Sequence, residues 1–157
     1  MKETARILLI DDDESIRKAV SKALEKAGYR VETAENGTQA IEKAQANFYN
    51  LALIDIRLPD MEGTKLLTMI KDTTPRMVKI ILTGYPALQN AIEAVNKGAD
   101  AYLTKPINLA ELRKVIKEHL KKQVEESKFG EQKVGEFVET RLKQLGTEET
   151  DKKMNKP

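Results

Sequence analysis

The chain has 157 residues, of which 27 are basic and 25 acidic, so its net charge is only +2. Hydrophobic residues make up 40% of it, enough to form the core of one domain with a short appendage. The nearly balanced charge gives no general argument for binding to nucleic acid or to an anionic membrane. The absence of cysteine excludes disulfides and cysteine-held zinc, and the single histidine, His119, excludes a histidine metal cluster.

The first residues, Met1 to Thr4, are followed by only a short apolar run and do not have the pattern of a signal peptide. No apolar run in the sequence approaches the length that spans a membrane. We therefore expect a cytoplasmic protein.

Strand-like and helix-like segments alternate along the first part of the chain. The strand-like segments are short and apolar, whereas the helix-like segments repeat apolar residues every three or four positions. Gly28 and Gly98 follow two of the helical segments and are typical helix stops. In chain order we predict a strand at 5–10, a helix at 15–27, a strand at 29–33, a helix around 40–44, a strand at 51–55, a helix at 63–71, a strand at 77–82, a helix at 88–95, a strand at 100–104 and a helix from 109 to about 120.

Five strands that each lead into a helix through a short connection are typical of a parallel sheet with helices on both faces, since each crossover must cover one face. We therefore predict an α/β fold, a doubly wound five-stranded parallel sheet, over residues 1–125. Many functions share such folds, so the function has to be read from individual residues.

The central feature of the sequence is segment 51–63, in which the apolar run Leu-Ala-Leu-Ile ends at Asp55. Pro59 and Gly63 then turn the chain. An apolar run bounded by turn signals is typical of a strand buried on both faces. Asp55 is therefore expected at the carboxyl end of a buried strand, where α/β folds bind ligands.

Other polar side chains also come directly after predicted strands. Asp11 and Asp12 follow the first strand, Thr83 follows the fourth and Lys105 follows the fifth. Because the carboxyl ends of parallel strands share one edge, we expect these side chains to converge with Asp55. Three carboxylates in one place repel one another unless a cation is present, and Mg²⁺ suits their oxygen ligands.

These groups are the ones that transfer of a phosphoryl group to a carboxylate requires. Asp55 is a competent nucleophile, and a carboxylate that is ionised at neutral pH needs no general base. The metal ion and Lys105 would neutralise the phosphoryl oxygens, Thr83 would offer a hydroxyl donor, and Gly84 would leave room for the incoming group. We predict that Asp55 accepts a phosphoryl group.

Four segments resemble the receiver domains of bacterial two-component response regulators. They are Ile-Asp-Asp-Asp-Glu-Ser-Ile-Arg at 10–17, Leu-Ile-Asp-Ile-Arg-Leu-Pro-Asp-Met-Glu-Gly at 53–63, Ile-Leu-Thr-Gly-Tyr at 81–85 and Ala-Tyr-Leu-Thr-Lys-Pro at 101–106. The resemblance extends over about the first 125 residues and is closest to stand-alone, chemotaxis-type regulators. It implies a flavodoxin-like sheet with the strand order 2-1-3-4-5.

The resemblance also implies roles for the residues at this edge. Asp55 would be the phosphoacceptor. Mg²⁺, or Mn²⁺ in its place, would be held by three side chains and one backbone carbonyl, those of Asp11, Asp12, Asp55 and Arg57. Thr83 and Lys105 would contact the phosphoryl group, and the orientation of Tyr102 would report the phosphorylation state. The Lys105–Pro106 peptide bond is expected to be cis.

Arg57, Gly84 and Tyr85 flank the predicted site and are expected to tune access to it. Arg57 and Tyr85 would shield the phosphoryl group from water and slow its hydrolysis. For two other acids we prefer a structural interpretation, because acids after strands often cap helices. Asp13 is predicted to cap the first helix, and Asp60 is predicted to be a loop residue rather than a metal ligand.

The resulting hypothesis is a signalling domain and not an enzyme, apart from its own phosphorylation and slow dephosphorylation. A sensor histidine kinase or a histidine phosphotransfer protein would supply the phosphoryl group. The face formed by the fourth helix, fifth strand and fifth helix would then change its affinity for an unknown output protein. The alternatives are an interaction module that works without phosphorylation and an aspartyl-phosphate hydrolase, although the hydrolase would want an acid where Arg57 stands.

The last part of the chain is rich in Lys, Glu and Gln. Apolar residues at helical spacing after Gly130 predict a helical extension over residues 126–146 that Gly146 ends, and residues 147–157 are predicted to be a disordered tail. About 30 residues cannot bury the core of a DNA-binding domain, so no DNA binding is expected. The extension either folds back on the receiver or binds a partner. A homodimer would form through it or through the fourth-helix face.

Overall fold

The computed structural model describes residues 4–84 and 87–154, with the backbone alone at 133, 134, 137 and 143–154. It divides into two compact units, Met1–Lys121 and Lys122–Pro157, and each is described by itself. Within the described ranges, no helix combines the length and the apolar character that crossing a membrane requires.

The described residues of the first unit form a five-stranded parallel sheet. Its strands are β1 (Arg6–Ile10), β2 (Arg30–Ala34), β3 (Leu51–Asp55), β4 (Val78–Thr83) and β5 (Ala101–Thr104). They lie in the order β2-β1-β3-β4-β5, and every neighbouring pair is parallel. The predicted doubly wound α/β fold and its strand order are therefore confirmed.

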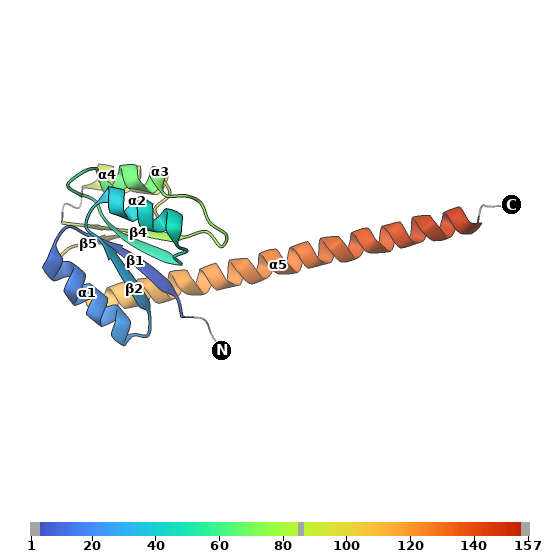
Figure 1. Ribbon diagram of the computed structural model, residues 1–157, viewed down its shortest axis with the longest axis horizontal. Coiled ribbons are helices and arrows are strands. Elements are labelled where there is room, and N and C mark those ends of the chain that lie inside the picture. Colours follow the sequence, from blue (N-terminus) through green and yellow to red (C-terminus); the bar gives the residue numbers. More distant parts are fainter. Residues whose placement is uncertain (1–3, 85–86, 155–157) are drawn as a thin grey trace. The chain divides into compact units, whose positions relative to one another are not determined.

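Helices cover both faces of this sheet (Figure 1). They are α1 (Glu14–Lys26), α2 (Gly37–Ala46), α3 (Gly63–Met69), α4 (Leu88–Asn96) and α5 (Leu109–Met154). Helices α2, α3 and α4 pack on one face of the sheet, and α1 with the first part of α5 packs on the other. Alternate residues of β1 serve the two faces, Leu8 and Ile10 on the first and Ile7 and Leu9 on the second. A strand buried on both faces therefore reads as one continuous apolar run.

Local signals in the sequence determine several helix ends. The carboxylate of Asp13 accepts a hydrogen bond from the amide of Ile16 at 3.2 Å, which confirms its predicted cap of α1. Asn36 caps α2 in the same way. Gly28 and Gly98 follow α1 and α4 with positive φ angles of 98° and 103°, a conformation that favours glycine at a helix end.

Helix α5 differs from the sequence-based expectation, since it runs without a break from Leu109 to Met154. It passes through Gly130 and also through Gly146, where we expected the helical extension to end. Gly130 does not adopt a positive φ angle, and a glycine inside a helix costs only about 1 kcal/mol relative to alanine. The Lys, Glu, Gln and Arg residues around it favour the helix. Residues 147–154, predicted to be disordered, are helical, and residues 155–157 lie outside the described part.

Candidate functional site

Five side chains that the sequence places at strand ends lie at one edge of the sheet. Asp55 ends β3, Thr83 ends β4, and Asp11 directly follows β1. The strand register aligns these ends, with Ile10 opposite Ile54 and Asp55 opposite Leu82. The remaining two are Asp12 and Lys105. The backbone amide of Lys105 donates a hydrogen bond to the carbonyl of Thr83 at 2.6 Å, which fixes the residue after β5 beside the end of β4.

The three aspartates form a compact acidic cluster. One carboxylate oxygen from each of Asp11, Asp12 and Asp55 lies within 4.8 Å of the others. Asp11 and Asp55 are buried, with exposed fractions of 1% and 7%, whereas Asp12 is exposed. Burial and the neighbouring charge of Asp11 raise the pKa of Asp55, and Lys105 opposes this rise. Three oxygen donors at this spacing suit a hard divalent cation, so the cluster can hold a metal ion.

Lys105 supplies the positive charge at the acidic cluster. Its Nζ lies 2.8 Å from Oδ2 of Asp11 and 3.3 Å from Oδ2 of Asp55. Burial alone would lower the pKa of Lys105, but the hydrogen bond and charge of Asp11, together with Asp55, outweigh it and the pKa is raised. Lys105 therefore stays protonated at neutral pH. The bond to Pro106 is cis, as expected, and a second cis bond joins Thr74 to Pro75.

Thr83 and Tyr102 lie on the neighbouring strands β4 and β5. Thr83 is fully buried at the end of β4. Tyr102 is half-buried, pairs in register with Ile81 and packs against the core on the side of α2, α3 and α4. Thr83 therefore lies at the edge where the strands end, whereas Tyr102 lies inside β5. Their roles toward a phosphoryl group stay predictions.

The three residues predicted to tune access are Arg57, Gly84 and Tyr85, and the structure describes the first two. The backbone amide of Arg57 lies 3.4 Å from Oδ1 of Asp55, and its exposed side chain lines a cavity of about 110 Å³ with Asn90 of α4. Chain neighbours aside, a Cβ added to Gly84 would meet no atom of the described residues within 4 Å. Tyr85 lies outside the described residues.

One residue near the site has a contact that sequence reasoning missed. Asp60, predicted to be a loop residue, binds the first turn of α2 with both carboxylate oxygens. No local signal marks this contact, because its partners Gly37 and Thr38 are 23 and 22 positions away in the sequence.

A family model of the response regulator receiver domain matches residues 7–117. The chain belongs to this family. The receiver-domain matches among solved structures include a CheY-like response regulator receiver domain protein from Methanospirillum hungatei, 45% identical with a TM-score of 0.76 over 79% of this chain and 99% of that one. A response regulator from Burkholderia pseudomallei, 31% identical with a TM-score of 0.68 over 78% of this chain and 73% of that one, was solved with a phosphorylated aspartic acid, a calcium ion and citrate.

Among curated proteins, the transcriptional regulatory protein ZraR of Klebsiella oxytoca is 38% identical over 118 residues, which are 75% of this chain and 27% of that protein. The first curated relatives are much longer than the receiver, and the chain spans 27%, 58% and 26% of their lengths. What they share with this chain is therefore the receiver domain of two-component signal transduction.

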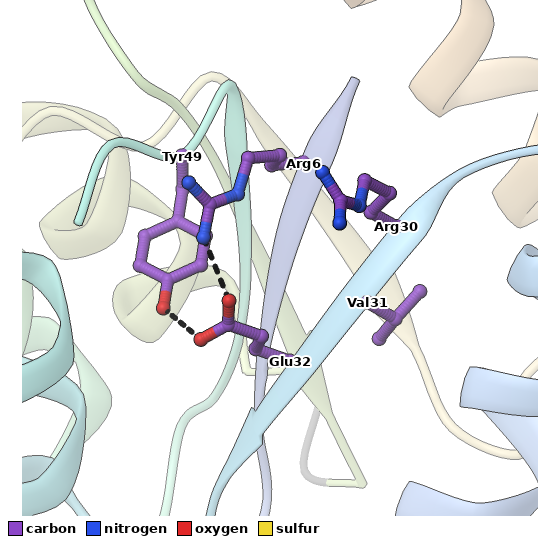
Figure 2. A pocket seen from close by; sticks show the side chains of 5 residues that line it. All are labelled: Arg6, Arg30, Val31, Glu32 and Tyr49. Atoms are coloured by element: carbon purple, nitrogen blue, oxygen red, sulfur yellow. Dashed lines mark hydrogen bonds and ion pairs between the residues drawn. The ribbon is translucent and has the colours of Figure 1, made fainter. Parts of the chain in front are cut away.

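A second polar cluster lies at the amino-terminal ends of the strands (Figure 2). A pocket of about 430 Å³ is lined there by Arg6, Arg30, Val31, Glu32 and Tyr49. Glu32 accepts a hydrogen bond from the Tyr49 hydroxyl and pairs with Arg6 at 2.7 Å, and the Arg6 guanidinium lies 5.3 Å from the centre of the Tyr49 ring. The Tyr49 hydrogen bond and, after it, the contacts of Arg6 lower the pKa of Glu32. This cluster ties β1, β2 and the entry to β3 together.

Proposed function

We propose that Asp55 accepts a phosphoryl group from the phosphohistidine of a sensor histidine kinase or a histidine phosphotransfer protein. The observation that carries the proposal is the position of Lys105, whose Nζ contacts both Asp11 and Asp55 beside the acidic cluster. A fixed cation next to a buried carboxylate stabilises negative charge that arrives on that carboxylate. The phosphorylated aspartic acid of the Burkholderia relative supports the same assignment.

The reaction needs few groups from the protein. An oxygen of Asp55 attacks the phosphorus atom, the P–N bond to the donor imidazole breaks, and the imidazole takes up a proton. Lys105 then pairs with a phosphoryl oxygen, and the Thr83 hydroxyl donates to another. Mg²⁺, or Mn²⁺, would be held by the side chains of Asp11, Asp12 and Asp55 with the carbonyl of Arg57, and it would neutralise part of the phosphoryl charge.

The output surface that we propose is the face of α4, β5 and the first part of α5. An exposed apolar stripe on α4 supports it, because Leu88, Ile92 and Val95 follow one another at helical spacing with exposed fractions of 78%, 53% and 61%. Contact of Thr83 and Lys105 with the phosphoryl group would shift this face between two packings, with Tyr102 turning inward. The partner would be an output protein or a second copy of the chain.

Helix α5 offers a second surface for a partner or a homodimer, since it exposes apolar side chains at Val124, Phe129, Val138 and Leu142. We propose that the protein works in the cytoplasm, where ATP-dependent histidine kinases form their phosphohistidine. This proposed function uses only the receiver domain and does not draw on the activities or partners of the longer curated relatives.

The test is phosphorylation by acetyl phosphate in the presence of Mg²⁺, followed by mass spectrometry of the intact protein and its peptides. The wild type is expected to gain one phosphoryl group on Asp55, and Asp55→Ala is expected to gain none. Asp13→Ala serves as the control for a lost carboxylate, because the Asp13 carboxylate caps α1 and is not one of the three carboxylates of the acidic cluster. An unmodified wild type, or an Asp55→Ala protein that is still modified, would overturn the proposal.

A further inference from the structure

The loop between β3 and α3 is tied to the start of α2 by one side chain. Oδ1 of Asp60 accepts a hydrogen bond from the amide of Gly37 at 2.9 Å. Oδ2 accepts two more, from the amide of Thr38 at 2.9 Å and from its hydroxyl at 2.7 Å. These bonds, led by that of the Thr38 hydroxyl, lower the pKa of Asp60 to about 2, so the carboxylate is ionised at neutral pH. A negative charge also suits the amino-terminal end of a helix.

The rest of this loop is closed on itself. The amide of Leu58 donates to the carbonyl of Met61 at 3.1 Å, and the amide of Gly63 donates to the carbonyl of Ile56 at 2.7 Å. Arg57 and Glu62 form an isolated antiparallel bridge across the loop. The loop is therefore a compact turn that begins directly after Asp55.

The turn packs closely against its neighbours at Gly63 and at Met61. A Cβ added to Gly63 would lie 2.3 Å from the carbonyl oxygen of Asp55. On the other side, a Cβ added to Gly37 would lie 2.4 Å from Sδ of Met61. Asp60 thus fastens the loop to α2 at a place where the two segments already pack closely.

We propose that Asp60 is a positioning residue for the metal site, because its bonds to α2 hold the loop that carries the Arg57 carbonyl. The inference rests on the proposed function, in which that carbonyl is a metal ligand. A ligand that is held in place before the ion arrives loses less conformational freedom on binding, so the ion binds more tightly. Asp60 itself does not touch the acidic cluster and acts through the loop.

Helix α2 provides a matched control. The side chain of Asn36 accepts a hydrogen bond from the amide of Gln39 at 2.8 Å, so it caps the same first turn as Asp60. Asn36 directly precedes α2, so its cap joins residues that are neighbours in the sequence and does not involve the loop after β3. Asn36→Ala therefore weakens the start of α2 without releasing the loop after β3, whereas Asp60→Ala does both.

The experiment measures Mg²⁺ binding by calorimetry, and hydrogen exchange of the metal-free protein at the amides of Leu58 and Gly63. For Asp60→Ala we expect a Mg²⁺ dissociation constant about tenfold higher than in the wild type, as is typical when a residue supporting a metal ligand is removed. We also expect faster exchange at both loop amides. Asn36→Ala should keep wild-type Mg²⁺ affinity and wild-type exchange in the loop. Asp60→Asn, which retains one acceptor oxygen, should fall between wild type and Asp60→Ala.

An unchanged Mg²⁺ affinity in Asp60→Ala, or an equal loss in Asn36→Ala, would overturn the inference, since Asp60 would then be a helix cap and nothing more. Both outcomes leave the proposed function intact as long as the wild type binds Mg²⁺ and is phosphorylated. A wild-type protein that binds no Mg²⁺ would instead contradict the proposed metal site, and the role of Asp60 would fall with it.

Discussion

Replacing Lys105 by methionine tests the electrostatics of the site directly. Methionine keeps an unbranched apolar side chain but removes the charge, so Asp11 and Asp55 lose the cation that contacts them at 2.8 and 3.3 Å. We expect the metal-free Lys105→Met protein to be clearly less stable than the wild type. We also expect added Mg²⁺ to stabilise the variant more than it stabilises the wild type, because the ion supplies the missing positive charge.

The contact distances give the size of the effect. With an effective dielectric constant of about 20, charges at these two distances attract by about 6 and about 5 kcal/mol. Desolvation of the buried groups cancels much of this attraction, and removing one partner of a buried ion pair typically costs about 3–5 kcal/mol. The exposed fractions of the side chains, 18% for Lys105 and 1% for Asp11, place the pair in this buried class.

Urea denaturation in EDTA and in Mg²⁺ measures the effect, and Lys97→Met is its control. Lys97 pairs with Glu93 at the same distance, 2.8 Å, but these side chains are 37% and 43% exposed. A surface pair on a helix contributes only about 0.3–0.5 kcal/mol. If Lys105→Met loses no more stability than Lys97→Met, the electrostatic reasoning for the site is wrong.

Three further predictions follow from other parts of the fold. Gly63→Ala should lose about 1–3 kcal/mol of unfolding free energy, because its Cβ would lie 2.3 Å from a backbone oxygen, whereas Gly135→Ala in open helix should gain up to about 1 kcal/mol; thermal denaturation compares the two. The folded-state pKa of Glu32 is below its ordinary value of 4.5. The wild type should therefore exceed Glu32→Gln in unfolding free energy by the largest amount above pH 4.5, and this difference should shrink as the pH falls through the lowered pKa. Urea denaturation at each pH measures the difference. Ile92→Ser should leave phosphorylation unchanged and stability within about 0.5 kcal/mol, yet weaken any self-association of the phosphorylated protein in analytical ultracentrifugation.

The strands and their order could be predicted because local sequence and global packing agree there. A run such as Leu51–Asp55 is apolar at every position but the last, and this pattern, bounded by turn signals, is typical of a strand with both faces covered. Once the strands are parallel, the residue after each of them must lie at one edge. Asp11, Thr83 and Lys105 were therefore brought near Asp55 by topology alone, without knowledge of any side-chain contact.

The contact of Asp60 with α2 and the full length of α5 could not be predicted from the sequence. The bond between Asp60 and Gly37 joins the loop after β3 to the first residue of α2, and neither sequence position carries a mark of the other. In α5, Gly130 and Gly146 are only weak stop signals. A glycine commonly ends a helix by adopting the left-handed conformation, and Gly130 does not adopt it. Glycine predicted the helix ends correctly at Gly28 and Gly98, where the chain has to turn back toward the sheet.

The proposed metal site would therefore combine ligands of two kinds. Asp11 and Asp55 are held by the strand ladder, in which the amide of Asp11 donates to Ala34 and the amide after Asp55 donates to Leu82, both at 3.1 Å. The Arg57 carbonyl belongs to the loop that follows this ladder, where the turn itself and the bonds of Asp60 help to hold it. A loop ligand can follow the changes of the site as a phosphoryl group is gained and lost, but it needs a tether to be ready for the ion. In our proposal Asp60 is that tether, and it can be altered without changing the charge at Asp55.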